Sequence, residues 1–140
     1  MTITSCYDAL TNVLATASSA AVKFTKLPTN PPARLPALIV QWNSTAPQSQ
    51  TFAALGNRKA RQRNHDFNAI LLIGRSGDAA NEDYDARAKA ELCVAGIDAD
   101  STLAGACVEA TVLQASPQVV TWDEQSLYGV SVRVRILEDA

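Results

Sequence analysis

The first part of the chain carries apolar residues at the spacing of an amphipathic helix. They recur at intervals of three and four between Leu10 and Ala21, and Ser5 followed by Asp8 resembles a capping box. This pattern predicts a helix over residues 5–20. Its exposed positions are mostly Thr, Asn and Ser, so the helix presents a weakly charged face that is suited to contact with a neighbour.

Short apolar runs after this helix predict strands. Residues 22–24 alternate between apolar and polar, prolines at 28, 31 and 32 interrupt regular hydrogen bonding, and an apolar, β-branched run follows at 38–42. Residues 43–50 are polar and turn-rich, so we expect a flexible loop there.

A β-hairpin is predicted around Gly56-Asn57, a two-residue turn signal between residues 51–55 and a long segment that ends in the apolar run 67–73. Only the part from Phe67 onward is apolar enough to be buried, so the tip of the hairpin should protrude. This protruding arm is basic. Its cationic residues are Arg58, Lys59, Arg61 and Arg63.

A second helix is predicted over residues 79–96, after a turn at 74–78. Tyr84, Ala88, Leu92 and Ala95 mark one apolar face, which we expect to be buried, and the opposite face is charged. Gly96 is placed where a left-handed residue would end the helix.

The last third of the chain alternates between apolar and polar residues. Residues 108–112, 119–122 and 130–136 each predict a strand, so the expected order is helix, about four strands, helix, three strands. Because most of these elements are joined by short turns, the sequence predicts one α+β domain over residues 1–140. It should hold a mainly antiparallel, or mixed, sheet with both helices on one face and a protruding β-hairpin.

Composition narrows the class of protein. The chain has 140 residues, of which 47% are hydrophobic and 19% charged, values typical of a folded domain. The longest apolar run, 69–74, is too short to span a membrane, and no export signal is expected. The net charge of −2 gives no general reason to bind nucleic acid or an anionic membrane. Cysteines occur only at 6, 93 and 107, and this odd number favours reduced thiols in a cytosol.

Catalytic chemistry has little support in the residue inventory. His65 is the single histidine, and its place in the basic arm predicts a solvated strand residue rather than a catalyst. Cys93 and Cys107 lie in apolar sequence and are expected in the core.

Two loops resemble ligand-binding motifs, but each lacks residues that its motif requires. Asp98, Asp100 and Glu109 have the spacing of a calcium loop, yet Leu103 stands where such a loop needs glycine. Residues 74–77 lack the Gly-Lys-Ser/Thr ending of a phosphate loop. We therefore expect no catalytic residues, no metal site and no cofactor.

The basic arm has three interpretations. It is a solvated hairpin tip, a contact with an acidic protein neighbour, or a contact with nucleic-acid phosphates, although it lacks the aromatic residues that would stack on bases.

Short motifs follow one another in a set order along the whole chain. They are the N-terminal helix, Leu35-Pro36-Ala37-Leu38, the hairpin closing on residues 65–72, the helix 84–92, residues 100–105, and Leu127-Tyr128-Gly129 before the alternating strand. This order resembles the tail terminator, or tail completion, proteins of long-tailed bacteriophages, a family that more often shows Gly-Gly where Ala104-Gly105 stands here.

This resemblance implies a non-enzymatic structural subunit that forms a ring with copies of itself, usually six, on the last ring of the tail tube. It implies partners in the tail tube protein and the head–tail connector or head-completion protein, with genomic DNA only passing through the lumen and no membrane contact. The protein would be assembled in the host cytoplasm and reside at the head–tail junction of the virion. Candidate contact residues are Asn43, Ser44, Gln48, Gln50, Arg58, Lys59, Arg61 and Arg63.

Two other functions stay open. A head-completion or connector subunit would share the size and the ring symmetry, and a small nucleic-acid-binding module would use the basic arm. An enzyme has the least support.

Overall fold

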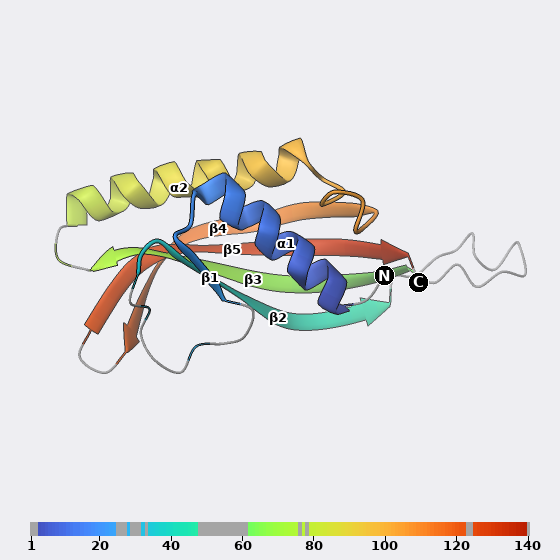
Figure 1. Cartoon of the computed structure of the whole chain (residues 1–140), viewed down its shortest axis with the longest axis horizontal. Coiled ribbons are helices and arrows are strands. Elements are labelled where there is room, and N and C mark those ends of the chain that lie inside the picture. The colour runs from blue at the N-terminus through green and yellow to red at the C-terminus, as the bar shows by residue number, and fades with distance from the viewer. Residues whose placement is uncertain are drawn as a thin grey trace, which may run out of the picture.

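The computed structural model describes residues 3–24, 28, 32, 34–47, 62–75, 77, 79–122 and 125–139. It contains two helices and five strands (Figure 1). In chain order they are α1 (Ile3–Ser18), β1 (Val22–Phe24), β2 (Ala37–Pro47), β3 (Gln62–Arg75), α2 (Ala79–Ala99), β4 (Glu109–Trp122) and β5 (Gln125–Asp139).

The strands form one sheet in the order β1-β2-β3-β5-β4. β1 and β2 are parallel, whereas β2 with β3, β3 with β5, and β5 with β4 are antiparallel. β2 and β3 make a long hairpin whose register runs from Ala37 opposite Leu72 to Pro47 opposite Arg63. The predicted α+β class and the mainly antiparallel, mixed sheet are confirmed.

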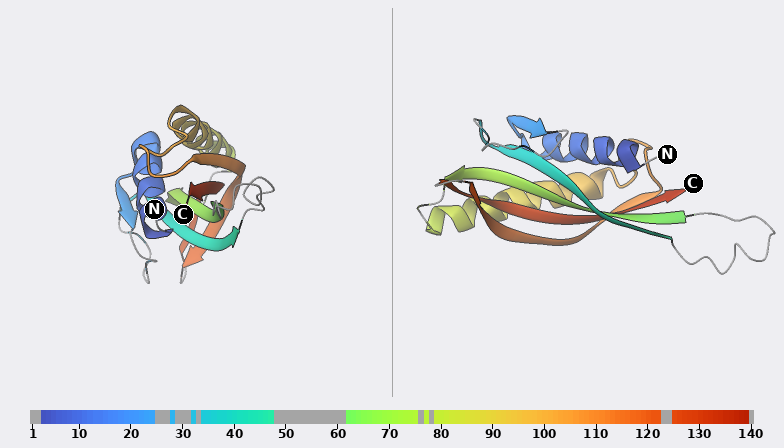
Figure 2. Two further views of the ribbon diagram at one scale, coloured as in Figure 1. Left: turned by 90° about the vertical axis from the view of Figure 1, so that its right-hand side faces the viewer. Right: turned by 90° about the horizontal axis from the view of Figure 1, so that it is seen from below.

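Both helices cover the same face of this sheet, as predicted (Figures 1 and 2). Strand alternation places Phe67 of β3 and Val134 of β5 on that face. They pack with Leu10 and Leu14 of α1 and with Ile97 of α2 in a single buried cluster. The main core therefore lies between the helix pair and the sheet.

The buried face of α2 differs from the predicted one. Tyr84 is 67% exposed and Leu92 is 47% exposed, whereas Ala86, Cys93 and Ile97 are buried. The helix has small apolar residues on more than one face, and close approach to α1 and the sheet favours the face that carries alanine and cysteine. The larger residues Tyr84 and Leu92 are left on the outside.

Gly96 does not end α2, which continues to Ala99. A Cβ atom on Gly96 would lie 2.5 Å from the Cβ of Ala17, so the two helices approach each other closely at this glycine. Left-handed backbone appears later, at Leu103, Ala104 and Gly105, which have φ angles of 50°, 59° and 84°. The predicted left-handed cap at Gly96 is therefore wrong.

Two predicted boundaries between strands and loops are also wrong. Residues 109–112 and 119–122 belong to one strand, β4, because a bulge between Val112 and Gln114 corrects its register. Pro117 is tolerated inside β4 because this strand lies at the edge of the sheet. Residues 43–47, expected in a loop, extend β2 after a second bulge, between Trp42 and Ser44. The predicted strand 51–55 and the turn at Gly56-Asn57 lie outside the described residues.

The sheet face away from the helices is mostly polar. A small second cluster of Ile39, Ile70, Leu72 and Leu127 occupies one part of it. Within the described part of the chain, no helix is long and apolar enough to cross a membrane.

Candidate functional site

A buried polar cluster joins α1 to the ends of β3 and β5. Its members are Cys6, His65 and Glu138, which are 0%, 0% and 1% exposed. His65 lies opposite Ile136, and Glu138 follows two positions later on the same face of β5. Cys6 lies in α1, on the helix face that packs onto this end of the sheet. The fold thus brings a thiol, an imidazole and a carboxylate together in the interior.

Hydrogen bonds link this cluster to the surface through β2. The indole Nε1 of Trp42 donates to Thr45 Oγ1 at 3.0 Å, and Thr45 Oγ1 lies 2.7 Å from His65 Nδ1. The other ring nitrogen, His65 Nε2, lies 3.3 Å from Glu138 Oε1. That contact has the distance of an ion pair but not the geometry of a hydrogen bond, and Nε2 has no hydrogen-bond partner among the described residues. The buried Nε2 of His65 therefore lies close to the Glu138 carboxylate without forming a hydrogen bond to it.

The thiol of Cys6 donates to Glu138 Oε2 at 3.6 Å. Burial, followed by the adjacent Glu138 carboxylate, raises the pKa of Cys6 to about 12. The thiol thus keeps its proton at neutral pH, and without a change in its surroundings it is a poor nucleophile.

The outcome for the sequence-based expectations is mixed. His65 was predicted to be solvated, but it is fully buried because its side chain lies on the helix-covered face of β3, next to Phe67. Cys93 and Cys107 are in the core as predicted, and burial raises the pKa of each to about 11. The cluster gave no sequence signal, since Cys6 and Glu138 are 132 positions apart.

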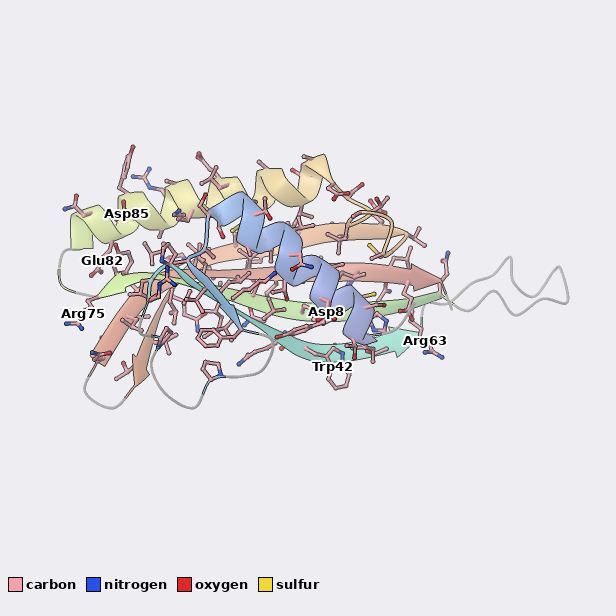
Figure 3. All side chains as sticks on the ribbon, in the orientation of Figure 1. Asp8, Trp42, Arg63, Arg75, Glu82 and Asp85 are labelled. Carbon is pink, nitrogen blue, oxygen red and sulfur yellow. The ribbon has the colours of Figure 1, made fainter. Side chains whose placement is uncertain are left out.

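The predicted contact residues are described only in part. Asn43 and Ser44 are exposed on β2, and Arg63 is exposed at the start of β3, at the same end of the hairpin. Figure 3 shows Arg63 and Trp42 toward the end of the molecule that lies opposite Arg75, Glu82 and Asp85. The remaining candidates lie outside the described residues. They are Gln48, Gln50, Arg58, Lys59 and Arg61.

Both edges of the sheet offer backbone groups for further pairing. β4 is the last strand on one side, and among the described strands β5 is its sole partner. On the other side β1 covers only residues 37–39 of β2. Within the described residues, the outer edge of β2 over residues 40–47 therefore has no paired strand.

Exposed apolar side chains accompany these edges. Val119 and Leu113 on β4 are 57% and 42% exposed, and Trp42 on the opposite edge strand is 52% exposed. A groove of about 330 Å³ lies beside Val119, between α2 and the sheet, with Ala86 and Tyr128 in its lining. The hydroxyl of Tyr128 on β5, which lines this groove, donates to Asp85 of α2 at 3.0 Å.

Charge is divided unevenly along the chain. Residues 1–77 contain eight basic and two acidic residues, a net charge of +6. Residues 78–109, which include α2 and the turn after it, contain two basic and eight acidic residues, a net charge of −6. The β1–β2 side of the sheet thus belongs to the basic part of the chain, and the α2 layer beside β4 to the acidic part.

Comparison with known proteins adds little to this picture. No protein-family model matches the chain, and no curated protein matches it. One solved structure with some similarity is a chain described as "Virion of native gene transfer agent (GTA) particle", at 18% identity and a TM-score of 0.40. The match covers 94% of this chain and 90% of that chain. At this TM-score the likeness supports no conclusion about function.

Proposed function

We propose that this chain is a structural subunit of a phage-type virion, and that it forms a ring which terminates the tail tube and joins it to the head connector. The observation that carries the proposal is a pair of strand edges on opposite sides of one sheet, β4 and residues 40–47 of β2, neither of which has a paired strand among the described residues. The order of sequence motifs along the chain supports the assignment to a tail terminator.

Open edges are a hazard for an isolated protein because they pair with other chains. A closed ring removes this hazard, since each subunit covers one edge of the next through a head-to-tail contact. β4 is 14 residues long, and although a bulge and Pro117 interrupt its pairing groups, this length is large for an edge strand. We therefore assign the outer edge of β4 to a second copy of this chain.

The partner edge on that second copy is the exposed part of β2. Without the four basic residues of the arm, residues 1–77 hold four basic and two acidic residues, a net charge of +2, against −6 for residues 78–109. This difference favours contact between the β1–β2 side of one subunit and the α2 side of the next. Exposed Trp42 on β2 and the groove beside Val119 supply the apolar part of this contact.

The basic arm has a separate role in this proposal. We assign Arg58, Lys59 and Arg61, with Arg63, to contact with the tube or the connector rather than with a neighbouring subunit, because Arg63 lies opposite Pro47 at one end of the sheet and not along its edges. Genomic DNA would pass through the ring without specific recognition.

A binding experiment separates the tail terminator from the head-completion alternative. The purified chain is mixed with purified tail tubes and, separately, with connector complexes, and the pellets are analysed after sedimentation. A tail terminator sediments with tubes at their ends, as seen by electron microscopy. Sedimentation with connectors but not with tubes would move the assignment to a head-completion subunit, and sedimentation with neither would contradict both.

A further inference from the structure

We propose that Cys6, His65 and Glu138 bind one divalent transition-metal ion, with Zn²⁺ as the best fit, between α1 and the end of the sheet. The three side chains each offer one ligand atom, and these atoms lie within 4.8 Å of one another. All three residues are buried, and His65 Nε2 lacks a hydrogen-bond partner among the described residues. The inference does not depend on the proposed role in a tail.

Two of the separations between these ligand atoms, each measured to a different oxygen of Glu138, are close to those of tetrahedral zinc ligands. Usual zinc–ligand distances place tetrahedral nitrogen and oxygen ligands about 3.4 Å apart and sulfur and oxygen ligands about 3.6 Å apart. In this structure His65 Nε2 lies 3.3 Å from Glu138 Oε1, and Cys6 Sγ lies 3.6 Å from Glu138 Oε2. Small rotations of the Glu138 carboxylate would present a single oxygen to an ion.

The donor set selects among metals. A thiolate with an imidazole and a carboxylate suits Zn²⁺ and its analogue Co²⁺, whereas Ca²⁺ and Mg²⁺ prefer oxygen ligands alone. Three protein ligands leave a fourth position, which water can fill.

Binding is a proton-exchange step. The S–H bond of Cys6 breaks, a sulfur–metal bond forms, and one proton leaves to solvent, so no oxidant or reductant is needed. The metal takes the place of that proton beside Glu138. Because the thiol gives up its proton when the ion binds, metal binding should strengthen as the pH rises.

Thr45 and Trp42 form a second layer around the site. When Nε2 of His65 binds the ion, Nδ1 carries the ring proton and donates it to Thr45 Oγ1, 2.7 Å away. Thr45 Oγ1 also accepts from Trp42 Nε1, so the ion would fix the orientation of Trp42 on the exposed edge of β2. The metal would thus fasten α1, β3 and β5 together and order a surface residue.

The test uses the full chain after dialysis against a chelator, with Co²⁺ as the probe. The expected result is a near-ultraviolet thiolate-to-cobalt absorption band that saturates at one equivalent, is lost when Zn²⁺ is added, and is accompanied by release of one proton per ion. A wild-type titration with no thiolate band overturns the proposal.

Variants assign the ligands. Cys6→Ser should abolish the band and weaken Co²⁺ binding by more than about 100-fold, whereas Cys93→Ser, which removes another buried thiol, should leave the band intact. Glu138→Gln, which keeps the shape of the side chain, should also weaken binding. A band that persists in Cys6→Ser and disappears in Cys93→Ser would contradict the assignment, and circular dichroism confirms that each variant is folded.

Discussion

Gly96 of α2 lies so close to Ala17 of α1 that a Cβ atom at position 96 would stand 2.5 Å from the Cβ of Ala17. This contact sets the spacing between the two helices that cover the sheet. Lys89 of α2 strengthens the same junction by donating to the carbonyl oxygen of Ser18 at 2.8 Å, at the end of α1. The helix pair is therefore held by a small-residue contact and a helix-end hydrogen bond.

Gly96→Ala should destabilise the protein. Alanine is favoured over glycine inside a helix by about 1 kcal/mol, but here the added methyl group must push α1 and α2 apart. Overpacking of this kind costs about 1–3 kcal/mol, so we expect a net loss in the free energy of unfolding, measured by urea denaturation.

A control and a rescue make that result specific. Gly77→Ala should change stability little, because no atom of the described residues lies within 4 Å of the added atom. Gly96→Ala combined with Ala17→Gly should recover part of the loss by removing the opposing methyl group. Equal effects of alanine at 77 and 96 would contradict the close helix contact.

Folding stability should fall at alkaline pH because of the three buried thiols. Burial raises the pKa of Cys6 to about 12 and that of Cys93 and Cys107 to about 11, above the ordinary value of 9.0. Between these values the folded protein keeps protons that the unfolded chain releases. The stabilising effect is complete below pH 9 and is lost as the pH rises toward 11 and 12.

Thiolate absorbance checks this directly in metal-free protein. The native protein should show little thiolate signal at a pH where the urea-unfolded chain is already deprotonated. Coincident titration curves for the two states would contradict the burial of the thiols.

The pair formed by Asp66 and Arg135 should make stability sensitive to acid. Arg135 donates to both carboxylate oxygens of Asp66, at 2.9 and 3.2 Å, and this hydrogen bonding lowers the pKa of Asp66 below its ordinary value of 3.8. A lowered pKa stabilises the fold above the ordinary value, and the effect is lost as the pH falls through the folded-state value. Asp66→Asn should therefore flatten the fall of the urea midpoint below about pH 4.

Arg135→Gln offers a matched test of the same pair. It should flatten the acid dependence as Asp66→Asn does, and the double variant should add little because the two residues act together. An additive double variant would show that the two side chains are not coupled.

Charge reversal in the basic arm tests its role in assembly. If the arm contacts tail or connector proteins, replacing Arg58, Arg61 and Arg63 by glutamate should give overlong or headless tails, as counted by electron microscopy. The purified variant should keep the melting temperature of the wild type. Normal tail length with normal head joining would show that the arm is merely solvated.

Period-two alternation predicted the strands well but not their continuity. Val130 and Val132 alternate with Ser131 in β5, and the structure buries the two valines as this pattern requires. A bulge restores the register inside β4, and no local pattern reveals whether an irregular residue ends a strand or only bends it. For this reason the sequence predicted two separate strands, ending at 112 and starting at 119, where the structure has one.

The helix face and the buried cluster depended on information that sequence spacing does not carry. Large residues such as Tyr84 and Leu92 suggested the inner face of α2, but the inner face is set by how closely the helix approaches Ala17 of α1. Likewise, the basic residues that precede His65 in the sequence predicted a solvated side chain. Only the pairing of β3 with β5 places His65 next to Glu138. Tertiary contacts decided both cases.

Ring formation is tested most directly by native mass spectrometry of the purified chain, measured alone and in the presence of tail tubes. We expect an assembly near six times the chain mass of 14.9 kDa, in solution or on tubes. Val119→Lys at the β4 edge should disrupt that assembly, whereas Arg133→Gln on the uncovered face of β5 should preserve it. A monomer at every concentration, with no binding to tubes, would contradict the proposal that this chain is a ring-forming tail protein.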